Sequence, residues 1–173
     1  MSKELLIGCG AARDKRLVVH GQPSKWGELV TLDNNPDHKP DVVMDLAAHG
    51  MFLPFHDNTF DEIHAYEVLE HIGIQGDYKT FFAQFEEFHR ILKPGGFFCA
   101  TCPSWKSMWA WGDPSHTRVI TSGTLVFLSQ TEYSRQVGKT PMSDFRSIYK
   151  GDFETVHCDE DEDFLRFAMR AIK

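Results

Sequence analysis

Short apolar runs that end at an acidic residue are the feature that most restricts how this chain folds. Residues 28–32 run into Asp33, residues 40–44 run into Asp45, and residues 60–66 run into Glu67. Runs of this length, bounded by turn residues and rich in branched or aromatic side chains, predict buried strands. A further apolar run at residues 4–7 ends at Gly8-Cys9-Gly10 and predicts the first strand.

One helix is well defined by its periodicity. Aromatic and aliphatic residues recur at helical spacing between residues 77 and 92, and Lys93-Pro94-Gly95-Gly96 then stops the run. Residues 97–102 predict a fifth strand and a helix is expected from Thr121. Glycines and a proline interrupt any helical period between residues 10 and 33, so we expect a short helix there or extended chain around residues 15–20.

The end of the chain predicts two more strands, at residues 153–159 and 164–172, joined by an acidic turn as an antiparallel hairpin. Strands that alternate with helices over the first hundred residues predict an open α/β sheet, whose ligands bind at the carboxyl ends of the strands. Asp33, Asp45 and Glu67 occupy three of these ends. We therefore expect a single domain over residues 1–173 with a site at this edge.

Composition restricts the partners of this domain. A length of 173 residues with 42% hydrophobic content suits one sizeable core, and a net charge of -7 opposes tight binding to nucleic acid. No stretch is apolar enough for a membrane span and no signal peptide is evident, so we expect a cytoplasmic protein that does not bind membranes. Four cysteines suit a reducing compartment.

Five motifs in order resemble the class I S-adenosylmethionine-dependent methyltransferases over residues 4–103. They are Leu5-Leu6-Ile7-Gly8-Cys9-Gly10, Leu32-Asp33, the segment 53–61 of sequence LPFHDNTFD, Glu67-Val68-Leu69-Glu70-His71, and Arg90-Ile91-Leu92-Lys93-Pro94-Gly95-Gly96. The resemblance implies a three-layer, Rossmann-like methyltransferase fold with a mostly parallel seven-stranded sheet and a C-terminal antiparallel hairpin. It also implies S-adenosyl-L-methionine as cofactor and S-adenosyl-L-homocysteine as product.

The resemblance assigns the cofactor-binding residues. Gly8, Cys9 and Gly10 would approach the methionine and ribose through their main chain, and Asp33, with Asn34 beside it, would accept hydrogen bonds from the ribose hydroxyls. By the same resemblance, two further pairs line the rest of the site: Asp45 and Leu46 at the adenine, and Ala65 and Glu67 at the methionine end. For Asp33 and Asp45 an ordinary turn or helix-capping role is the alternative, and Glu67 could equally cap the next helix.

Two positions depart from the family pattern, because Leu6 stands where many relatives have an acid and Ala12 replaces a frequent third glycine. The chain also begins almost directly at the first strand. We therefore expect either an open site or a partner subunit that covers it.

Methyl transfer from a sulfonium is an in-line displacement that depends on alignment and exclusion of water. The catalytic residue stays unknown, with His71, Asp113 and His116 as the candidates for a base. Trp105, Trp109 and Trp111 flank a polar segment that could recognise an acceptor, with Arg118 binding an anion. The alternatives are that the segment packs on its own aromatics and that His71 serves packing.

No metal is expected, since Cys99 and Cys102 would point to opposite faces of a strand and no second cysteine pair follows. The motifs of DNA-base methyltransferases are absent, which leaves small molecules, sugars or lipids, and protein side chains as acceptors. Two other functions remain: a catalytically inactive cofactor-binding scaffold or regulatory subunit, and a dinucleotide-dependent oxidoreductase. For the latter, the glycine turn lacks the final glycine of the fingerprint.

Overall fold

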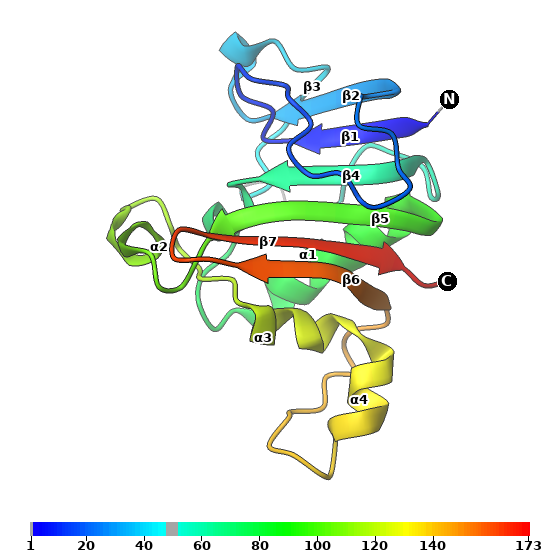
Figure 1. The fold of residues 1–173 in the computed structure, drawn as a ribbon, viewed down its shortest axis with the longest axis vertical. Coiled ribbons are helices and arrows are strands. Elements are labelled where there is room, and N and C mark those ends of the chain that lie inside the picture. The colour runs from blue at the N-terminus through cyan, green and yellow to red at the C-terminus, as the bar shows by residue number, and fades with distance from the viewer. Residues whose placement is uncertain (1, 48–51) are drawn as a thin grey trace.

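A seven-stranded mixed sheet organises the computed structural model, which describes residues 2–47 and 52–173 (Figure 1). Its spatial order is β3-β2-β1-β4-β5-β7-β6. The first five strands pair in parallel, whereas β7 pairs antiparallel with both β5 and β6. The strands are β1 (Lys3–Ile7), β2 (Glu28–Asp33), β3 (Val42–Val43), β4 (Phe60–Tyr66), β5 (Leu92–Pro103), β6 (Phe153–Glu160) and β7 (Phe164–Ala171). This topology confirms the predicted fold class and the C-terminal hairpin.

The helices of the described residues lie mainly on one face and at one end of the sheet (Figure 1). They are α1 (Tyr78–Ile91), α2 (Met108–Gly112), α3 (Ser122–Leu125) and α4 (Gln130–Gln136), with 3-10 turns η1 (Pro36–His38), η2 (Leu69–His71) and η3 (Val126–Leu128). The side chain of Asp77 caps α1 by accepting from the Thr80 amide, and the helix ends at Ile91, one residue inside the predicted bound. None of these helices has the length and apolar character that crossing a membrane requires.

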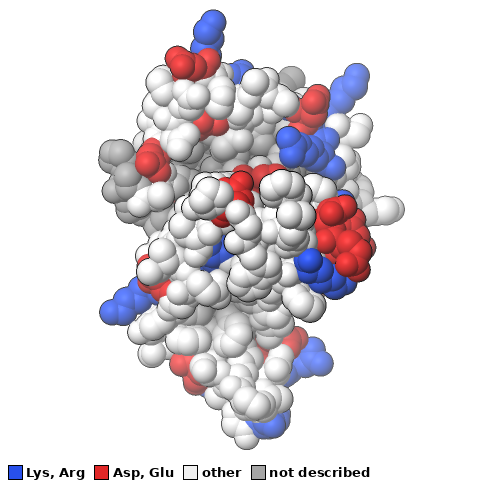
Figure 2. Space-filling model, turned by 90° about the vertical axis from the view of Figure 1, so that its left-hand side faces the viewer, with Lys and Arg blue, Asp and Glu red and all other residues white. Residues whose placement is uncertain are grey.

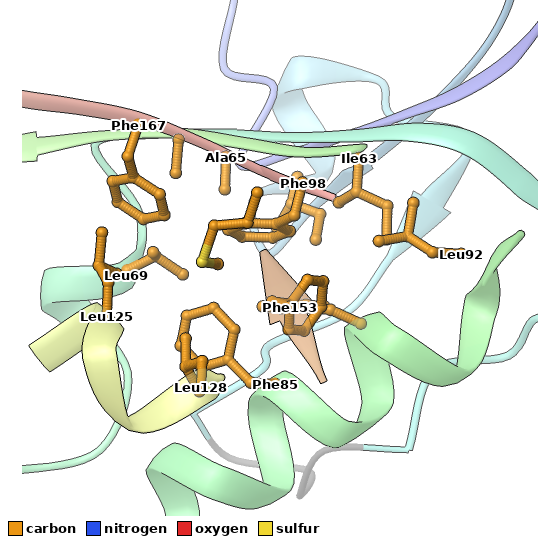
Figure 3. Close-up of a cluster of buried hydrophobic side chains, with 14 of the residues drawn as sticks. Ile63, Ala65, Leu69, Phe85, Leu92, Phe98, Leu125, Leu128, Phe153 and Phe167 are labelled. Atoms are coloured by element: carbon orange, nitrogen blue, oxygen red, sulfur yellow. The ribbon is translucent and has the colours of Figure 1, made fainter. Parts of the chain in front are cut away.

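The main core forms where α1 packs on the sheet (Figure 3). Phe85 and Phe88 of α1 meet Phe98 of β5 with ring centroids 5.5 and 4.8 Å apart, and Phe153 of β6 closes against Phe85. These rings are completely buried, so each contributes roughly 1.5–3 kcal/mol through removal of apolar surface from water. The aromatic stripe of this helix is therefore core, as its spacing predicts.

An extended segment, residues 11–27, covers the opposite face over β1 and β4 and supplies the third layer in place of a helix (Figure 1). Its Lys15 side chain is 2% exposed and lies 2.6 Å from Glu62 and 3.5 Å from Glu4, both buried. The Tyr66 hydroxyl accepts hydrogen bonds from the Arg16 and Leu17 amides. Glycine and proline residues keep this segment from forming a helix. Buried polar contacts hold it against the sheet instead.

Two predicted strands have a bound that differs from the structure by more than one residue. The third strand is only Val42–Val43 instead of residues 40–44. The fifth begins at Leu92, five residues before the predicted start, because Phe60 pairs with Leu92 and Glu62 with Phe97, which leaves residues 93–96 as an irregularity. The proline and glycines therefore form a bulge at the start of a strand and not a separate loop.

His64 is buried on the segment-covered face as a neutral imidazole. Its Nε2 donates to Glu62 at 2.7 Å and its Nδ1 accepts from the Tyr66 hydroxyl at 2.6 Å, because that hydroxyl already accepts from two amides. This arrangement uses one protonated ring nitrogen and one free lone pair. Burial accordingly lowers the pKa of His64, although the bond to Glu62 opposes the shift.

This lowered pKa predicts a loss of stability in mild acid. The unfolded chain takes up a proton at His64 below pH ~6.5, whereas the folded chain resists it, so the free energy of unfolding falls as pH decreases through that value. His64→Gln is expected to reduce this slope between about pH 7 and pH 5, measured by urea unfolding. His157→Gln, at an exposed position of β6, should keep the native slope. An unchanged slope in His64→Gln would contradict the assignment.

Candidate functional site

A cleft of about 540 Å³ lies at the carboxyl ends of the parallel strands. Figure 2 faces this edge and shows a hollow between the two halves of the molecule with acidic side chains at its floor. Its volume is within the range of small-molecule and cofactor sites. The lining residues are Ile7, Gly8, Gly10, Leu32, Asp33, Asn34, His38, Met44, Asp45, Leu46, Ala47, Glu67, Val68, His71, Ile72 and Ser115.

The glycine turn after β1 forms one wall of this cleft. Gly8 and Gly10 have φ values of 62° and 54°, a region that favours glycine. A Cβ on Gly8 would collide with the Cγ2 methyl of Val68, while one on Gly10 would meet nothing within 4 Å. The Cys9 amide donates to Leu32 at 3.2 Å and ties the turn to β2.

Substitution of these two glycines by alanine is expected to lower the free energy of unfolding to different extents. Both variants incur about 1–2 kcal/mol for a left-handed alanine, and Gly8→Ala adds about 1–3 kcal/mol of overpacking against Val68. Gly8→Ala is thus expected to be the less stable variant in urea unfolding. Val68→Ala added to Gly8→Ala should restore part of the loss, since it removes the colliding methyl. Equal losses in the two single variants would contradict this packing.

Asp33 is buried at the end of β2 and holds the turn. Its carboxylate accepts from the Gly10 and Asn35 amides, both at 2.8 Å. Burial opposes ionisation, but these main-chain donors together with the nearby His38 outweigh it and keep the pKa of Asp33 below its ordinary value. A carboxylate has about four acceptor positions. The two amides use two of them and His38 Nδ1, 3.3 Å from Oδ1, faces a third, which leaves one on Oδ2 for a ligand.

The other predicted cofactor residues divide into two groups. Asn34, Asp45 and Leu46 line the cleft, and the Asp45 carboxylate accepts from the Ala47 amide at 2.8 Å. Cys9 and Ala65 do not line it, because Cys9 packs beside Leu6 under the extended segment and the Ala65 side chain belongs to the main core. These two residues could contribute only main-chain atoms.

Glu67 lines the cleft directly after β4 in a conformation that few residues other than glycine adopt. Its φ is 58°. Its amide donates a hydrogen bond to the Thr101 carbonyl oxygen at 2.9 Å, and its carboxylate accepts one from the Thr101 hydroxyl at 2.5 Å. The turn η2 has Val68 at its N-cap and no side-chain capping bond, so Glu67 does not cap it. Strained residues of this kind are often held at functional sites by the surrounding structure.

The three candidate catalytic residues lie together next to the cleft. The rings of His71 and His116 are 4.7 Å apart, and His116 Nε2 lies 3.9 Å from the Asp113 carboxylate. His71 lines the cleft, and its Nδ1 lies 3.1 Å from the Ser115 carbonyl oxygen. The η2 turn and the loop that follows α2 therefore bring these predicted residues to one place.

Glu70 is the residue of this cluster that was not singled out from the sequence. It is 2% exposed, and neither of its carboxyl oxygens has a hydrogen-bond partner at ordinary geometry. Burial raises the pKa of Glu70 to about 8, and the nearby charges of Glu67 and Asp113 add to the rise, although the Cys102 thiol interacts favourably with the carboxyl. Its place beside a histidine in the Glu67–His71 motif was the available signal.

Two other sequence hypotheses receive a structural answer. Arg118 donates from Nη2 to the Ile74 carbonyl at 3.0 Å and to the Asp77 carbonyl at 2.6 Å, so it supports the turn before α1 and does not line the cleft. The prediction that it binds an anion at the site is wrong.

The three tryptophans of the segment that follows β5 are not packed together in the interior. Trp105, Trp109 and Trp111 are 49%, 61% and 68% exposed, so the segment does not simply pack on its own aromatics.

The cleft fits S-adenosylmethionine on its own geometry. The glycine turn leaves open space at Gly10, Asp33 keeps an acceptor position on Oδ2 for a ribose hydroxyl, and Leu46 offers an apolar wall for a purine. The three acids Asp33, Asp45 and Glu67 supply a negative lining that suits a sulfonium and an ammonium group.

Comparison with known families gives a match over the first part of the chain. Residues 5–100 match a family described as a methyltransferase domain, which is more than half of the 173 residues. A search of curated protein sequences finds no match.

Solved structures of low sequence identity share the fold. The N-methyltransferase NodS from Bradyrhizobium japonicum WM9 aligns over 99% of this chain and 86% of its own, at 16% identity and a TM-score of 0.56, and it has also been solved with S-adenosyl-L-homocysteine. A complex of the Trm112 methyltransferase activator and a putative methyltransferase from Haloferax volcanii aligns over 99% of this chain and 83% of its own, at 17% identity and a TM-score of 0.57. A SAM-dependent methyltransferase from Archaeoglobus fulgidus aligns over 98% of this chain and 86% of its own, at 14% identity and a TM-score of 0.57.

Proposed function

Since this chain belongs to the methyltransferase-domain family and uses S-adenosylmethionine, we propose that its cleft holds the cofactor and that an acceptor other than a DNA base enters beside α2. The observation that carries this proposal is the buried Asp33 carboxylate, which binds the glycine turn and still faces the cleft. The family match favours methyl transfer over the oxidoreductase alternative. The inactive scaffold has no support from the comparisons.

Each wall of the cleft receives one part of the cofactor in this proposal. Asp33 accepts from the ribose hydroxyls, with Asn34 at the same edge, while Gly8 and Gly10 allow the main chain to approach the methionine portion. Asp45 and Leu46 contact the adenine, and Glu67 lies at the methionine end. The bound cofactor supplies an electrophilic methyl group on a positively charged sulfur.

The residues of the chain itself would align the reacting groups. His71 lines the cleft together with Glu67, and the His116 ring lies 4.7 Å from that of His71, so an acceptor atom would approach the methyl group beside these histidines. Holding the acceptor in line is the main requirement of this displacement, because charge disappears from sulfur as the methyl leaves. A base is needed only for an acceptor that must lose a proton early.

The acceptor is expected to use the exposed tryptophans next to this end of the cleft. Helix α2 lies at the carboxyl end of the sheet (Figure 1), and Trp109 connects to the cluster through its carbonyl, which lies 2.8 Å from His116 Nδ1. Exposed aromatic rings suit a ring-bearing or apolar acceptor, either a small molecule, a sugar or lipid, or a protein side chain. The net charge of -7 argues against nucleic acid.

A panel of acceptors from these three classes, with double-stranded DNA added, tests the proposal through release of S-adenosylhomocysteine. The native protein is expected to methylate at least one class, and Trp109→Ala should raise the acceptor KM while leaving S-adenosylhomocysteine affinity unchanged. Val18→Ala, at an exposed apolar position on the extended segment, is the matched control. Methyl transfer to DNA bases alone, or an unchanged acceptor KM in Trp109→Ala, would overturn the acceptor assignment.

The same tryptophans offer an alternative role as the contact for a partner subunit. Met108 beside them is 72% exposed, and one structural relative is a complex with an activator protein. In that case Trp109→Ala would weaken assembly with a second protein and leave the acceptor KM of the isolated chain unchanged. Light scattering on the purified chain with and without candidate partners distinguishes the two roles.

A further inference from the structure

A cluster of one buried carboxylate and two imidazoles lies at the acceptor end of the cleft. The ligand-type atoms of Glu70, His71 and His116 all lie within 4.8 Å of one another. Metal–ligand bonds of roughly 2.0–2.2 Å place neighbouring ligands about 3–4 Å apart, so these side chains need only a small inward movement to share one ion.

Both imidazoles are held in the state that a metal ligand requires. His71 Nδ1 lies 3.1 Å from the Ser115 carbonyl oxygen and His116 Nδ1 lies 2.8 Å from that of Trp109. A carbonyl only accepts, so each Nδ1 carries the proton and each Nε2 keeps its lone pair. Metal-bound histidines are commonly oriented by such a bond from the other ring nitrogen.

The Glu70 carboxyl group gives an independent indication that this cluster suits a cation. Both of its oxygens are buried without a hydrogen-bond partner at ordinary geometry, and His116 Nε2 is 4.0 Å from Oε1. A buried carboxylate normally has donors or a cation as partners, because leaving it unpaired is costly. The negative charges of Glu67 and Asp113 lie close enough to interact with the Glu70 carboxyl group, so the local electrostatic field favours a positive ion.

The backbone fixes the cluster before any ion arrives. The Glu70 carbonyl accepts from the Thr117 amide at 2.9 Å and from the Arg118 amide at 3.2 Å, which joins η2 to the loop that carries His116. The His116 amide donates to Asp113 at 3.1 Å within that loop. The three side chains are therefore positioned by main-chain hydrogen bonds, as a preorganised site requires.

We propose that Glu70, His71 and His116 bind a divalent transition-metal ion of the Mn²⁺, Fe²⁺, Co²⁺ or Zn²⁺ class, with open positions toward the cleft. Two imidazoles and one carboxylate are a ligand set for such ions, and they leave positions for water or an acceptor oxygen. This assignment revises the expectation of no metal, which considered only the cysteines. Ion binding itself does not depend on the identity of the acceptor.

The role of the ion at the acceptor rests on the proposed function. A hydroxyl oxygen of the acceptor would coordinate the ion and lose its proton to water more easily. Its lone pair then forms the C–O bond as the C–S bond breaks, and the electron pair of that bond stays on sulfur. The products are the methyl ether, neutral S-adenosylhomocysteine and the proton released to water.

The test titrates EDTA-treated full-length protein with Mn²⁺, Co²⁺, Zn²⁺ and Mg²⁺ by calorimetry, with Co²⁺ absorption as a second readout of nitrogen and oxygen ligands. One ion per chain is expected, with a preference for the transition metals over Mg²⁺. His116→Ala and His71→Ala should each weaken binding by at least roughly 100-fold, the upper end of what disturbing the groups around a metal ligand costs. His157→Ala is the matched control at an exposed position.

S-adenosylhomocysteine is titrated into the same samples to separate this inference from the proposed function, and circular dichroism confirms folding. Because His71 is exposed, His71→Ala keeps the test valid if His116→Ala fails to fold. Metal binding that survives in His71→Ala, or native protein that binds none of these ions while still binding S-adenosylhomocysteine, overturns the metal site. Metal binding without S-adenosylhomocysteine binding would contradict the proposed function and leave the metal site standing.

Discussion

Lys15→Met is expected to lower the free energy of unfolding by about 3–5 kcal/mol, the usual cost of removing one partner of a buried ion pair. Lys15 Nζ lies 2.6 Å from Glu62 and 3.5 Å from Glu4, and all three side chains are at most 2% exposed. The methionine fills a similar volume but leaves two buried carboxylates without a cation. Both stand on the sheet face that the extended segment covers, so the segment itself should loosen.

Urea unfolding of Lys15→Met and of Lys25→Met measures this effect. Lys25 is exposed on the same segment and serves as the matched control, with an expected change within about 0.5 kcal/mol. Adding Glu62→Gln to Lys15→Met should recover part of the loss, because one of the two unpaired charges disappears. A loss below about 1 kcal/mol in Lys15→Met would show that water reaches this network.

Asp33→Asn is expected to weaken binding of S-adenosylhomocysteine by at least about 100-fold. Hydrogen bonds to a charged acceptor contribute about 1.5–3 kcal/mol each, and 1.4 kcal/mol corresponds to a factor of ten. The substitution also disturbs the turn, because Oδ1 accepts from Asn35 and Oδ2 from Gly10, and an amide nitrogen cannot replace either oxygen. Both effects act on the same end of the cleft.

Calorimetric titration measures the affinity, and circular dichroism checks that the variant folds. Asp37→Asn, an exposed acid four residues away in η1, is the control and should bind as the native protein does. An affinity of Asp33→Asn within about threefold of the native value would remove Asp33 from the proposed site.

The sequence predicts best those parts whose signal is local. The helix of α1 follows from apolar spacing and a stop signal, and the structure shortens the prediction by one residue at each end. The acid that ends β2, the acid that follows β4 and the turn after β1 lie at one edge because parallel strands place their carboxyl ends together. Their convergence needed only a parallel arrangement of the strands, which the alternation of strands and helices predicts.

The parts that escaped prediction depend on contacts between distant residues. The Lys15 side chain is buried because Glu62, 47 positions later in the sequence, lies opposite it. No local sequence pattern predicts this ion pair. The polar alternation of Glu62, His64 and Tyr66 along β4 was a signal that this face carries a buried network. Glu70 escaped because its burial follows from the loop at residues 113–118, which two amides attach to its carbonyl.

A crystal structure of the protein with S-adenosylhomocysteine tests the central claim most directly. The account predicts the ligand in the cleft at the carboxyl ends of β1, β2 and β4, with its ribose hydroxyls on the Asp33 carboxylate, its adenine against Leu46 and its sulfur toward Glu67. Ligand bound elsewhere, for instance in the apolar pocket between α1 and η3 that Tyr78, Phe81 and Phe127 line, would contradict it.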